Sequence, residues 1–184
     1  MRKLLLFAFC FLAGFTRAFS QDEQILIIDL DALSYNIDWQ IFGSEDRDEV
    51  IGTIRNAWLG RGPKPSEWDL HFNSEYGKIR LKWKNRQEDW ELRLGNHYLS
   101  ISSTWPGQWD SWRVSDNDKT YTISAKYDNE GFQWTLSDQV QEIGWCFNLY
   151  YSDFWTWKYQ GNQEKMTDPL IMALVFLATY YSVE

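Results

Sequence analysis

Near the end of the chain, the segment DPLIMALVFLATYY begins at Asp168 and has no polar side chain from Leu170 to Ala178. Aspartate followed by Pro169 is typical of a helix start, with Asp168 as the N-cap and proline in the first turn. A helix that is apolar on every side lies in a membrane, against a partner or inside the fold. This one would be about 20 Å long, against about 30 Å of bilayer hydrocarbon. We therefore predict a helix over residues 168–182 that is buried within the protein.

Before this segment, apolar and polar residues alternate with a period of two, and turn sequences such as NSEYG, LGN and DNEG interrupt the alternation. Such alternation is typical of half-buried strands. It predicts twelve short strands: Gln24–Asp31, Ser34–Phe42, Glu49–Ala57, Glu67–Phe72, Lys78–Lys84, Asp89–Leu94, His97–Ser102, Ser111–Ser115, Thr120–Lys126, Phe132–Ser137, Gly144–Tyr151 and Phe154–Tyr159. A barrel of this size has a lumen wide enough for a helix. The predicted fold is all-β with one C-terminal helix: an antiparallel closed barrel of about twelve strands that encloses the hydrophobic helix.

Four tryptophans recur 22 residues apart, in motifs such as EWDL and DWEL: Trp68, Trp90, Trp112 and Trp134. A unit of this length is one hairpin with its turns, and residues i and i+2 share one face of a strand. The rings could form an exposed ladder that stacks on sugars, or a row that packs inward. The aliphatic residue two positions after each tryptophan favours the core.

The N-terminal residues have the pattern of a secretory signal: a basic start, an apolar run, and the small residues Ala18 and Ser20 before the cleavage point. We predict a signal peptide over residues 1–20 and a single domain over residues 21–184, exported to the periplasm or the extracellular space. Cleavage would lower the net charge from −8 to −11, because residues 1–20 carry three basic side chains and no acidic one. An acidic product of this kind is a poor ligand for nucleic acid. Cys146 would be its only cysteine, so no internal disulfide is expected.

The sequence contains no nucleophile elbow, no phosphate-binding glycine loop and no dinucleotide fingerprint. The two histidines, His71 and His97, have no partner at metal-ligand spacing, so neither a metal nor another cofactor is predicted. Asp116 and Asp118 lack the spaced ligands and the glycine of a calcium loop. Two carboxylates far apart in the sequence could still meet as a hydrolytic pair.

The segment KIRLKWKNR places its basic residues at alternate positions: Lys78, Arg80, Lys82, Lys84 and Arg86. In a single strand they would form a basic ridge about 27 Å long on the outer face of the barrel. Ile79, Leu81 and Trp83 would then point toward the core. The ridge could bind an anion, an anionic lipid surface or a partner protein. The alternative is a solvated face that pairs with the acidic side chains of Glu88–Glu91 on a neighbouring strand.

A second candidate surface lies in STWPGQWDSW, where Trp105 and Trp109 flank a Pro-Gly turn. Two tryptophans this close to a turn cannot both point inward easily. If they are exposed, they could stack on a sugar or contact a partner. If they are buried, they would plug one end of the barrel.

A twelve-stranded barrel threaded by a hydrophobic C-terminal helix resembles the tubby C-terminal-like superfamily, which includes LURP-one-related proteins and phospholipid scramblases. The resemblance rests on DPLIMALVFLATYY as the terminal helix, on EVIGTIRNAW (Glu49–Trp58) as an early strand, and on the Trp-x-Leu hairpins. It implies a barrel around a central helix and, for the tubby branch, contact with phosphoinositides. Family members are mostly intracellular, whereas this chain has the pattern of an exported protein. The proline-rich segment and the cysteine clusters of scramblases are not in the sequence.

Taken together, these patterns indicate an exported, non-enzymatic β-barrel binding or structural module, with a protein or an anionic surface as a possible partner. Nucleic acid is not an expected partner, and no transmembrane span is expected after signal cleavage. One alternative is a protein that binds anionic lipid or a membrane surface through the basic strand 78–86. A second alternative is a small secreted hydrolase with a dispersed carboxylate pair.

Overall fold

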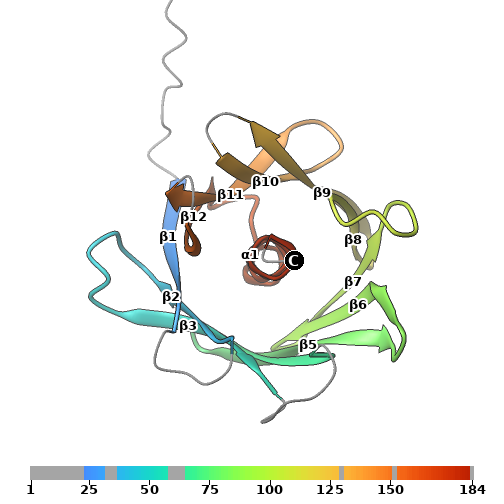
Figure 1. Cartoon of the computed structure of the whole chain (residues 1–184), viewed down its shortest axis with the longest axis horizontal. Helices are drawn as coiled ribbons and strands as arrows, with labels where there is room; N and C mark the ends of the chain where they lie inside the picture. Colours follow the sequence, from blue (N-terminus) through green and yellow to red (C-terminus); the bar gives the residue numbers. More distant parts are fainter. Residues whose placement is uncertain (1–22, 32–36, 58–64, 129–130, 151–152, 183–184) are drawn as a thin grey trace, which may run out of the picture.

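The computed structural model describes residues 23–31, 37–57, 65–128, 131–150 and 153–182. Its elements are β1 (Glu23–Leu30), β2 (Trp39–Phe42), β3 (Val50–Asn56), β4 (Glu67–Phe72), β5 (Glu75–Trp83), β6 (Arg86–Leu94), β7 (His97–Ser103), β8 (Ser111–Asp116), β9 (Lys119–Asp128), β10 (Gly131–Ser137), β11 (Glu142–Tyr150), β12 (Asp153–Asn162) and α1 (Asp168–Tyr181). Each strand pairs antiparallel with its neighbours in the sequence, and β1 pairs with β12, so the sheet closes into a barrel (Figure 1). The predicted fold class, a twelve-stranded antiparallel closed barrel with one C-terminal helix, is confirmed.

Helix α1 lies within the ring of strands in Figure 1. Its residues from Pro169 to Thr179 are all buried, and those from Leu170 to Ala178 belong to one hydrophobic cluster that contains side chains from all twelve strands. A helix with strands on every side has no face toward water, which accounts for the absence of a polar stripe in its sequence. Among the residues described, no helix is both long enough and apolar enough to cross a bilayer.

The predicted helix start needs a small correction. Thr167, not Asp168, is the N-cap, and α1 ends at Tyr181 with Ser182 as its C-cap. Asp168 lies in the first turn, and its Oδ2 accepts a hydrogen bond of 2.8 Å from Asn73 Nδ2 in the β4–β5 turn. A carboxylate in the first turn also interacts favourably with the helix dipole. Asp168 therefore ties the start of α1 to the barrel wall instead of capping it.

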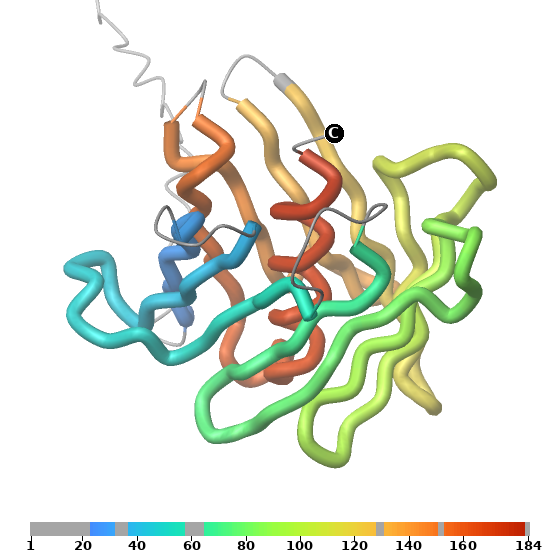
Figure 2. The backbone as a smooth tube through the Cα atoms, turned by 60° about the horizontal axis from the view of Figure 1, so that its bottom comes forward, coloured from blue at the N-terminus to red at the C-terminus, as the bar shows by residue number. Residues whose placement is uncertain are grey.

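The antiparallel order gives the barrel two ends with different connections. The hairpins β5–β6, β7–β8, β9–β10 and β11–β12 turn at the end where α1 finishes, which we call the rim end. The turns β2–β3, β4–β5, β6–β7, β8–β9 and β10–β11 lie at the other end, where α1 begins. Figure 2 shows the arms of β9–β10 and β11–β12 reaching beyond the C-terminal end of α1. The ends are thus built from separate sets of turns.

A buried tryptophan lies on every even-numbered strand: Trp39, Trp68, Trp90, Trp112, Trp134 and Trp157. All six are at most 2 % exposed, so the four at 22-residue intervals face the core, as the aliphatic pattern predicted. Several contact the C-terminal half of α1: Trp68 and Trp90 pack edge-on against Phe176, and Trp90 Nε1 donates to the hydroxyl of Tyr181 at 2.9 Å. The repeat is therefore a ring of tryptophans around the end of the helix.

The twelve strands match the predicted ranges within a few residues, with two notable differences. The second strand begins at Trp39, and Ile37 and Asp38, which were predicted to belong to it, precede it; Asp38 instead accepts the amide of Asn56 through its Oδ1. Residues 34–36 of the predicted strand and the predicted signal peptide, residues 1–20, lie outside the described residues. The second difference lies in the basic segment, where β5 ends at Trp83 and not at Lys84.

Candidate functional site

The first two residues of the predicted basic ridge lie on the outer wall and are paired with acids. Lys78 Nζ binds Glu67 Oε1 at 2.5 Å and lies 3.4 Å from Asp69 Oδ1, both on β4. Arg80 binds Glu91 Oε2 on β6 at 3.1 Å. Hydrogen bonding to Glu67 raises the pKa of Lys78 above its ordinary value. This part of the ridge is a solvated, ion-paired face: Arg80 pairs with Glu91 as the alternative interpretation predicted, whereas the partners of Lys78 are residues of β4 that it did not include.

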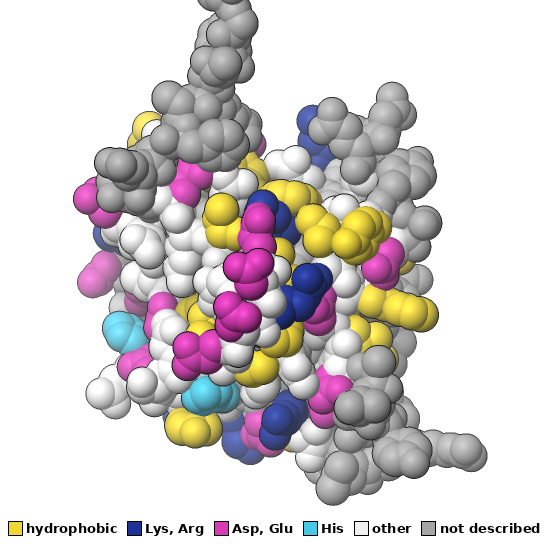
Figure 3. All heavy atoms as spheres, turned by 90° about the vertical axis from the view of Figure 1, so that its left-hand side faces the viewer, with side chains coloured by type: hydrophobic (Ala, Val, Ile, Leu, Met, Phe, Trp, Pro, Cys, Tyr) yellow, Lys and Arg dark blue, Asp and Glu magenta, His cyan; other side chains and the backbone are white. Residues whose placement is uncertain are grey.

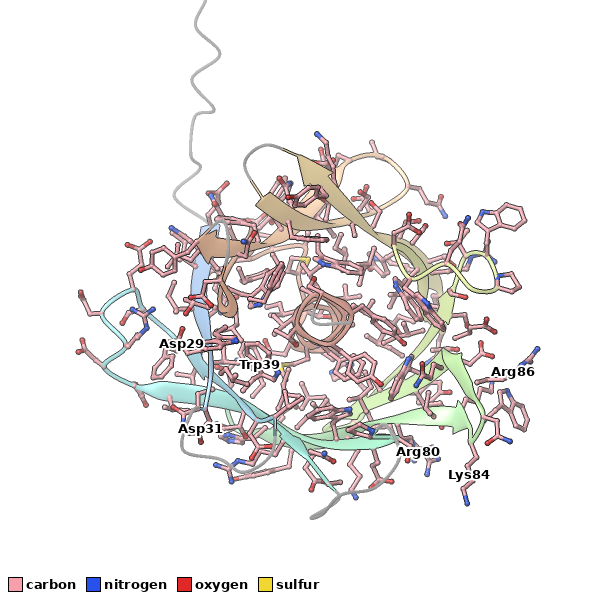
Figure 4. The ribbon with its side chains drawn as sticks, viewed as in Figure 1. Asp29, Asp31, Trp39, Arg80, Lys84 and Arg86 are labelled. Carbon is pink, nitrogen blue, oxygen red and sulfur yellow. The ribbon has the colours of Figure 1, made fainter. Side chains whose placement is uncertain are left out.

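Of the remaining three basic residues only Lys82 lies on the same strand, which corrects the prediction of one continuous ridge. Strand β5 ends at Trp83, so Lys84 lies in the turn and Arg86 begins β6. Lys82 and Lys84 form no ion pair with any residue that the structure describes, and Arg86 lies 3.9 Å from Asp89 Oδ2. Figure 4 shows Arg80, Lys84 and Arg86 pointing outward from this corner of the barrel. The three cations cluster at the tip of the β5–β6 hairpin, at the rim end.

Trp83 was predicted to point into the core, and this is wrong: its side chain is 55 % exposed. The pairing of β5 with β6 shifts register between Leu81 and Trp83, where the arms approach the turn. An irregularity of this kind breaks the alternation of faces that the sequence pattern assumes. Trp83 thus lies beside Lys82 and Lys84 on the surface.

The β7–β8 loop separates its two tryptophans. Trp105 is 64 % exposed, whereas Trp109 is half-buried and stacks on Tyr181 with ring centroids 5.3 Å apart and planes at 13°. Gly107, at φ +77°, donates its amide to Glu88 Oε1 at 2.9 Å and so ties the loop to β6. Trp105 is therefore exposed, as the first interpretation predicted. Trp109 covers the end of the helix, as the second interpretation predicted.

The loop and the hairpin tip together enclose a groove of about 580 Å³. It is lined by Ser66, Leu81, Lys84, Asn85, Arg86, Gln87, Glu88 and Trp109. The structure therefore brings together three of the predicted site residues: the cations Lys84 and Arg86, and the aromatic ring of Trp109. They belong to two separate sequence motifs. The stack on Tyr181 fixes the plane of Trp109, so its ring is a rigid wall of the groove.

Most exposed aromatic side chains of the described chain lie at this same end. They are Trp83, Trp105, Tyr127, Tyr150 and Trp155, which we call the aromatic rim. They lie on four consecutive hairpins, β5–β6 to β11–β12. The other exposed aromatic residue is Tyr76, at the opposite end. The sequence predictions included Trp105 but missed Tyr127, Tyr150 and Trp155.

The aromatic rim is continuous with the core. Tyr127 contacts Phe132 at 4.7 Å between ring centroids, Phe132 contacts Phe154 at 5.5 Å, and Phe154 contacts the buried Trp157 at 6.4 Å. Asn148 fixes the base of two hairpins: its Oδ1 accepts the amide of Phe132, and its Nδ2 donates to the carbonyl oxygen of Tyr150. The exposed rings are thus held by a packed aromatic layer beneath them.

The opposite end of the barrel is acidic. Its turns carry the described carboxylates Glu45, Asp46, Asp48, Glu49, Asp116, Asp118, Asp138, Glu142 and Glu164, and far fewer cations. Part of this charge is paired with the wall, where Arg47 binds Asp29 and Lys158 binds Glu45. Figure 3 shows the wall on the side of β1, where acidic and basic side chains lie next to each other. The molecule therefore has an aromatic end with clustered cations and an acidic end.

Catalytic groups are not evident among the described side chains. Three carboxyl groups have shifted pKa values, and each is shifted downward. Burial raises the pKa of Glu91, but hydrogen bonds from Arg80 and Tyr98 outweigh it; the pKa of Asp138 falls because backbone amides donate to it. A general acid needs the opposite shift. Within the described ranges, no three His, Cys, Asp or Glu side chains are arranged to hold a metal ion.

Comparison of the chain with protein families, with curated proteins and with solved structures found no match.

Proposed function

We propose that the protein is an exported, non-enzymatic binding module that docks through its aromatic rim on the interfacial layer of a lipid membrane. The observation that carries this proposal is the location of the exposed aromatics: five rings on four consecutive hairpins, all at one end. Because these rings lie on four different hairpins, they can all contact the same ligand only if that ligand is an extended surface. Trp and Tyr are the side chains that favour the bilayer interface.

The cations at the β5–β6 tip support an anionic membrane as the preferred surface. Lys82 and Lys84 lie next to Trp83 without an ion-pair partner in the described chain, and each cation near an anionic surface contributes about 1 kcal/mol. The acids of the opposite end would point away from the lipid. This revises the hypothesis of a basic strand 78–86, since Lys78 and Arg80 on the wall are already paired.

Membership of the tubby-like superfamily stays a proposal as well. A closed barrel of twelve strands with a hydrophobic C-terminal helix supports it. No family and no solved structure matched the chain, so the comparisons add no support to this membership. Export rests on the sequence of residues 1–20, and we propose it on that pattern alone.

The test is co-sedimentation of the purified protein with vesicles of phosphatidylcholine, with and without phosphatidylglycerol. Apolar transfer of an exposed tryptophan ring contributes about 1–2 kcal/mol, so removing two rings should weaken binding by about tenfold or more. The test variant is the double substitution Trp105→Ser and Trp155→Ser, on separate hairpins. The matched control is Tyr76→Ser, which removes an exposed ring from the opposite end. The proposal fails if the wild-type protein binds neither vesicle, or if the control weakens binding as much as the double variant.

A further inference from the structure

A groove of about 370 Å³ lies at the rim end, where α1 finishes. Its lining is mostly aromatic and contains one carboxylate: Gln108, Trp109, Asp110, Ala125, Phe132, Trp134 and Tyr181. We call it the aromatic groove. It has the size of a small-molecule site, since such sites usually measure about 300–1,000 Å³. None of these lining residues is basic, in contrast to the neighbouring groove that Lys84 and Arg86 line.

The rings of the aromatic groove are held in place by the rest of the barrel. Trp134 Nε1 donates to Ser182 Oγ at 2.9 Å, and the Tyr181 hydroxyl donates to the carbonyl oxygen of Gln87 at 2.6 Å. Trp109 stacks on Tyr181 with ring planes at 13°. Because the polar atoms of Trp134 and Tyr181 already have partners, these rings offer a ligand their π surface and not a hydrogen-bond donor. Such a surface attracts a cation through the quadrupole of the rings.

Two further features give the aromatic groove a negative potential. Asp110 is exposed, and its carboxylate makes no hydrogen bond or ion pair with the residues that the structure describes. The backbone oxygen of Asp110 accepts the amide of Ala125 at 2.7 Å, which ties this residue to β9. Helix α1 also ends here, and no basic residue lies in its last turn to offset the negative end of the helix dipole. The groove therefore favours a positively charged ligand.

We infer that the aromatic groove binds a quaternary ammonium group, the choline head of phosphatidylcholine. A primary ammonium group needs hydrogen-bond acceptors on several sides, and the groove offers one carboxylate. A trimethylammonium group donates no hydrogen bond, and aromatic rings recognise it through cation–π attraction. Trp109 lines both this groove and the neighbouring one, so the phosphate of the same head group faces Lys84 and Arg86. The inference rests on the proposed function, because docking through the rim brings both grooves to the lipid head groups.

The first experiment tests the aromatic groove without a membrane. Phosphocholine and choline are titrated into ¹⁵N-labelled protein, and the indole N–H signals of the tryptophans are followed by NMR. We expect saturable shifts of the Trp109 and Trp134 signals and no shift of the Trp83 signal, which comes from another hairpin. Choline should bind about tenfold more tightly than its neutral isostere 3,3-dimethylbutanol, which has the same shape without the charge. Equal binding of the isostere, or no saturable shift, would overturn the inference.

Two variants test the lining. Asp110→Asn should weaken phosphocholine binding by about threefold, as expected for an exposed charge pair, with an unchanged unfolding midpoint. Trp109→Leu should weaken it by about tenfold, and the loss of one indole signal identifies Trp109. The matched control is Asp69→Asn, which removes an exposed carboxylate from the wall outside the groove and should leave binding unchanged. Equal weakening in the Asp69 and Asp110 variants would mean nonspecific attraction to an acidic protein and would overturn the inference.

A second experiment separates the lipid from a soluble choline compound. Co-sedimentation compares vesicles of phosphatidylcholine with vesicles of phosphatidylethanolamine, each with the same share of phosphatidylglycerol. Asp110→Asn should weaken binding to the first by about threefold and leave binding to the second unchanged. Equal binding of wild-type protein to both would overturn the lipid as the ligand. If phosphocholine shifts the two indole signals but no vesicle binds, the proposed function fails; vesicle binding without those shifts would overturn the inference alone.

Discussion

Substitution of Leu174 by aspartate tests how the barrel is held together. Leu174 is fully buried near the middle of α1, and its Cδ2 lies 3.6 Å from the position that a Cβ on Gly144 of β11 would occupy. Losing the leucine side chain costs about 2–3 kcal/mol of apolar transfer. Burying a carboxyl group raises its pKa by about 3–5 units, which adds about 4 kcal/mol at pH 7, because the group must then take up a proton that the unfolded chain does not bind at this pH. The total, about 6–7 kcal/mol, is comparable to the whole stability of a domain of this size.

The sign of the pH dependence sharpens this prediction. The folded-state pKa of the new carboxyl group lies above its unfolded value of about 3.9, so the folded state binds the extra proton between these two values. The destabilisation is then complete above the folded pKa and shrinks to the packing loss at about pH 4. Leu174→Ala should instead lose about 2–5 kcal/mol at both pH values, because it creates a cavity without a charge.

The assay is urea unfolding followed by near-ultraviolet circular dichroism, which reports the packing of the core tryptophans. At pH 7 we expect Leu174→Asp to show no native signal, and at pH 4 we expect its midpoint to approach that of Leu174→Ala, with wild-type protein measured at both pH values as the reference. A Leu174→Asp protein with the wild-type midpoint at pH 7 would refute the reasoning, since a solvated helix tolerates aspartate.

Three further predictions concern single features of the wall and the core. Gly77→Ala should cost about 3 kcal/mol in the same assay, because its Cβ would overlap the carbonyl oxygen of Arg93 and force β5 and β6 apart; wild-type stability would mean that the two strands do not approach so closely at Gly77. Reversing Lys82 and Lys84 to glutamate should change the free energy of unfolding by less than about 0.5 kcal/mol, and a large loss would mean that they are not on the surface. Cys146 is fully buried and burial raises the pKa of its thiol, so it should react with a thiol reagent only at the rate of unfolding; fast labelling of native protein would contradict its burial.

The strands could be predicted from the sequence because one physical rule governs most of the barrel. A wall with a packed inner face and a solvated outer face imposes a period of two, and most of the strands keep that period, such as β4 and β8. The position of Trp90 and Trp112 on the inner face followed from the aliphatic residue two positions later. The helix was evident for the complementary reason, since only a segment surrounded on all sides has no polar face.

The aromatic rim could not be predicted because the same rule fails where strands outlast the core. Trp83, Tyr127 and Trp155 lie two residues from Leu81, Ala125 and Trp157, so their position in the alternation assigns them to the inner face. Tyr127 and Trp155 are exposed nevertheless, because the arms of β9–β10 and β11–β12 extend beyond the C-terminal end of α1 (Figure 2). Trp83 is exposed because the pairing of β5 with β6 shifts register beside it. Whether such a ring is exposed depends on how far its hairpin arm extends past the end of the helix. The alternation of apolar and polar residues in the sequence does not indicate that length. Turn sequences next to these residues, such as DNEG, were the one available signal.

The architecture limits where binding can occur at all. Closure removes the strand edges that would otherwise pair with another chain, and α1 fills the lumen. Much of the outer wall is engaged in ion pairs between neighbouring strands, such as Arg80 with Glu91. The turns at the two ends of the barrel are the surfaces that remain for binding. Because successive turns alternate between the ends, the residues at one end can be substituted without altering the other end. Aromatic rings with cations at one end and carboxylates at the other are what such independence permits, and this is why substitutions in the aromatic rim can be compared with a control such as Tyr76→Ser at the opposite end.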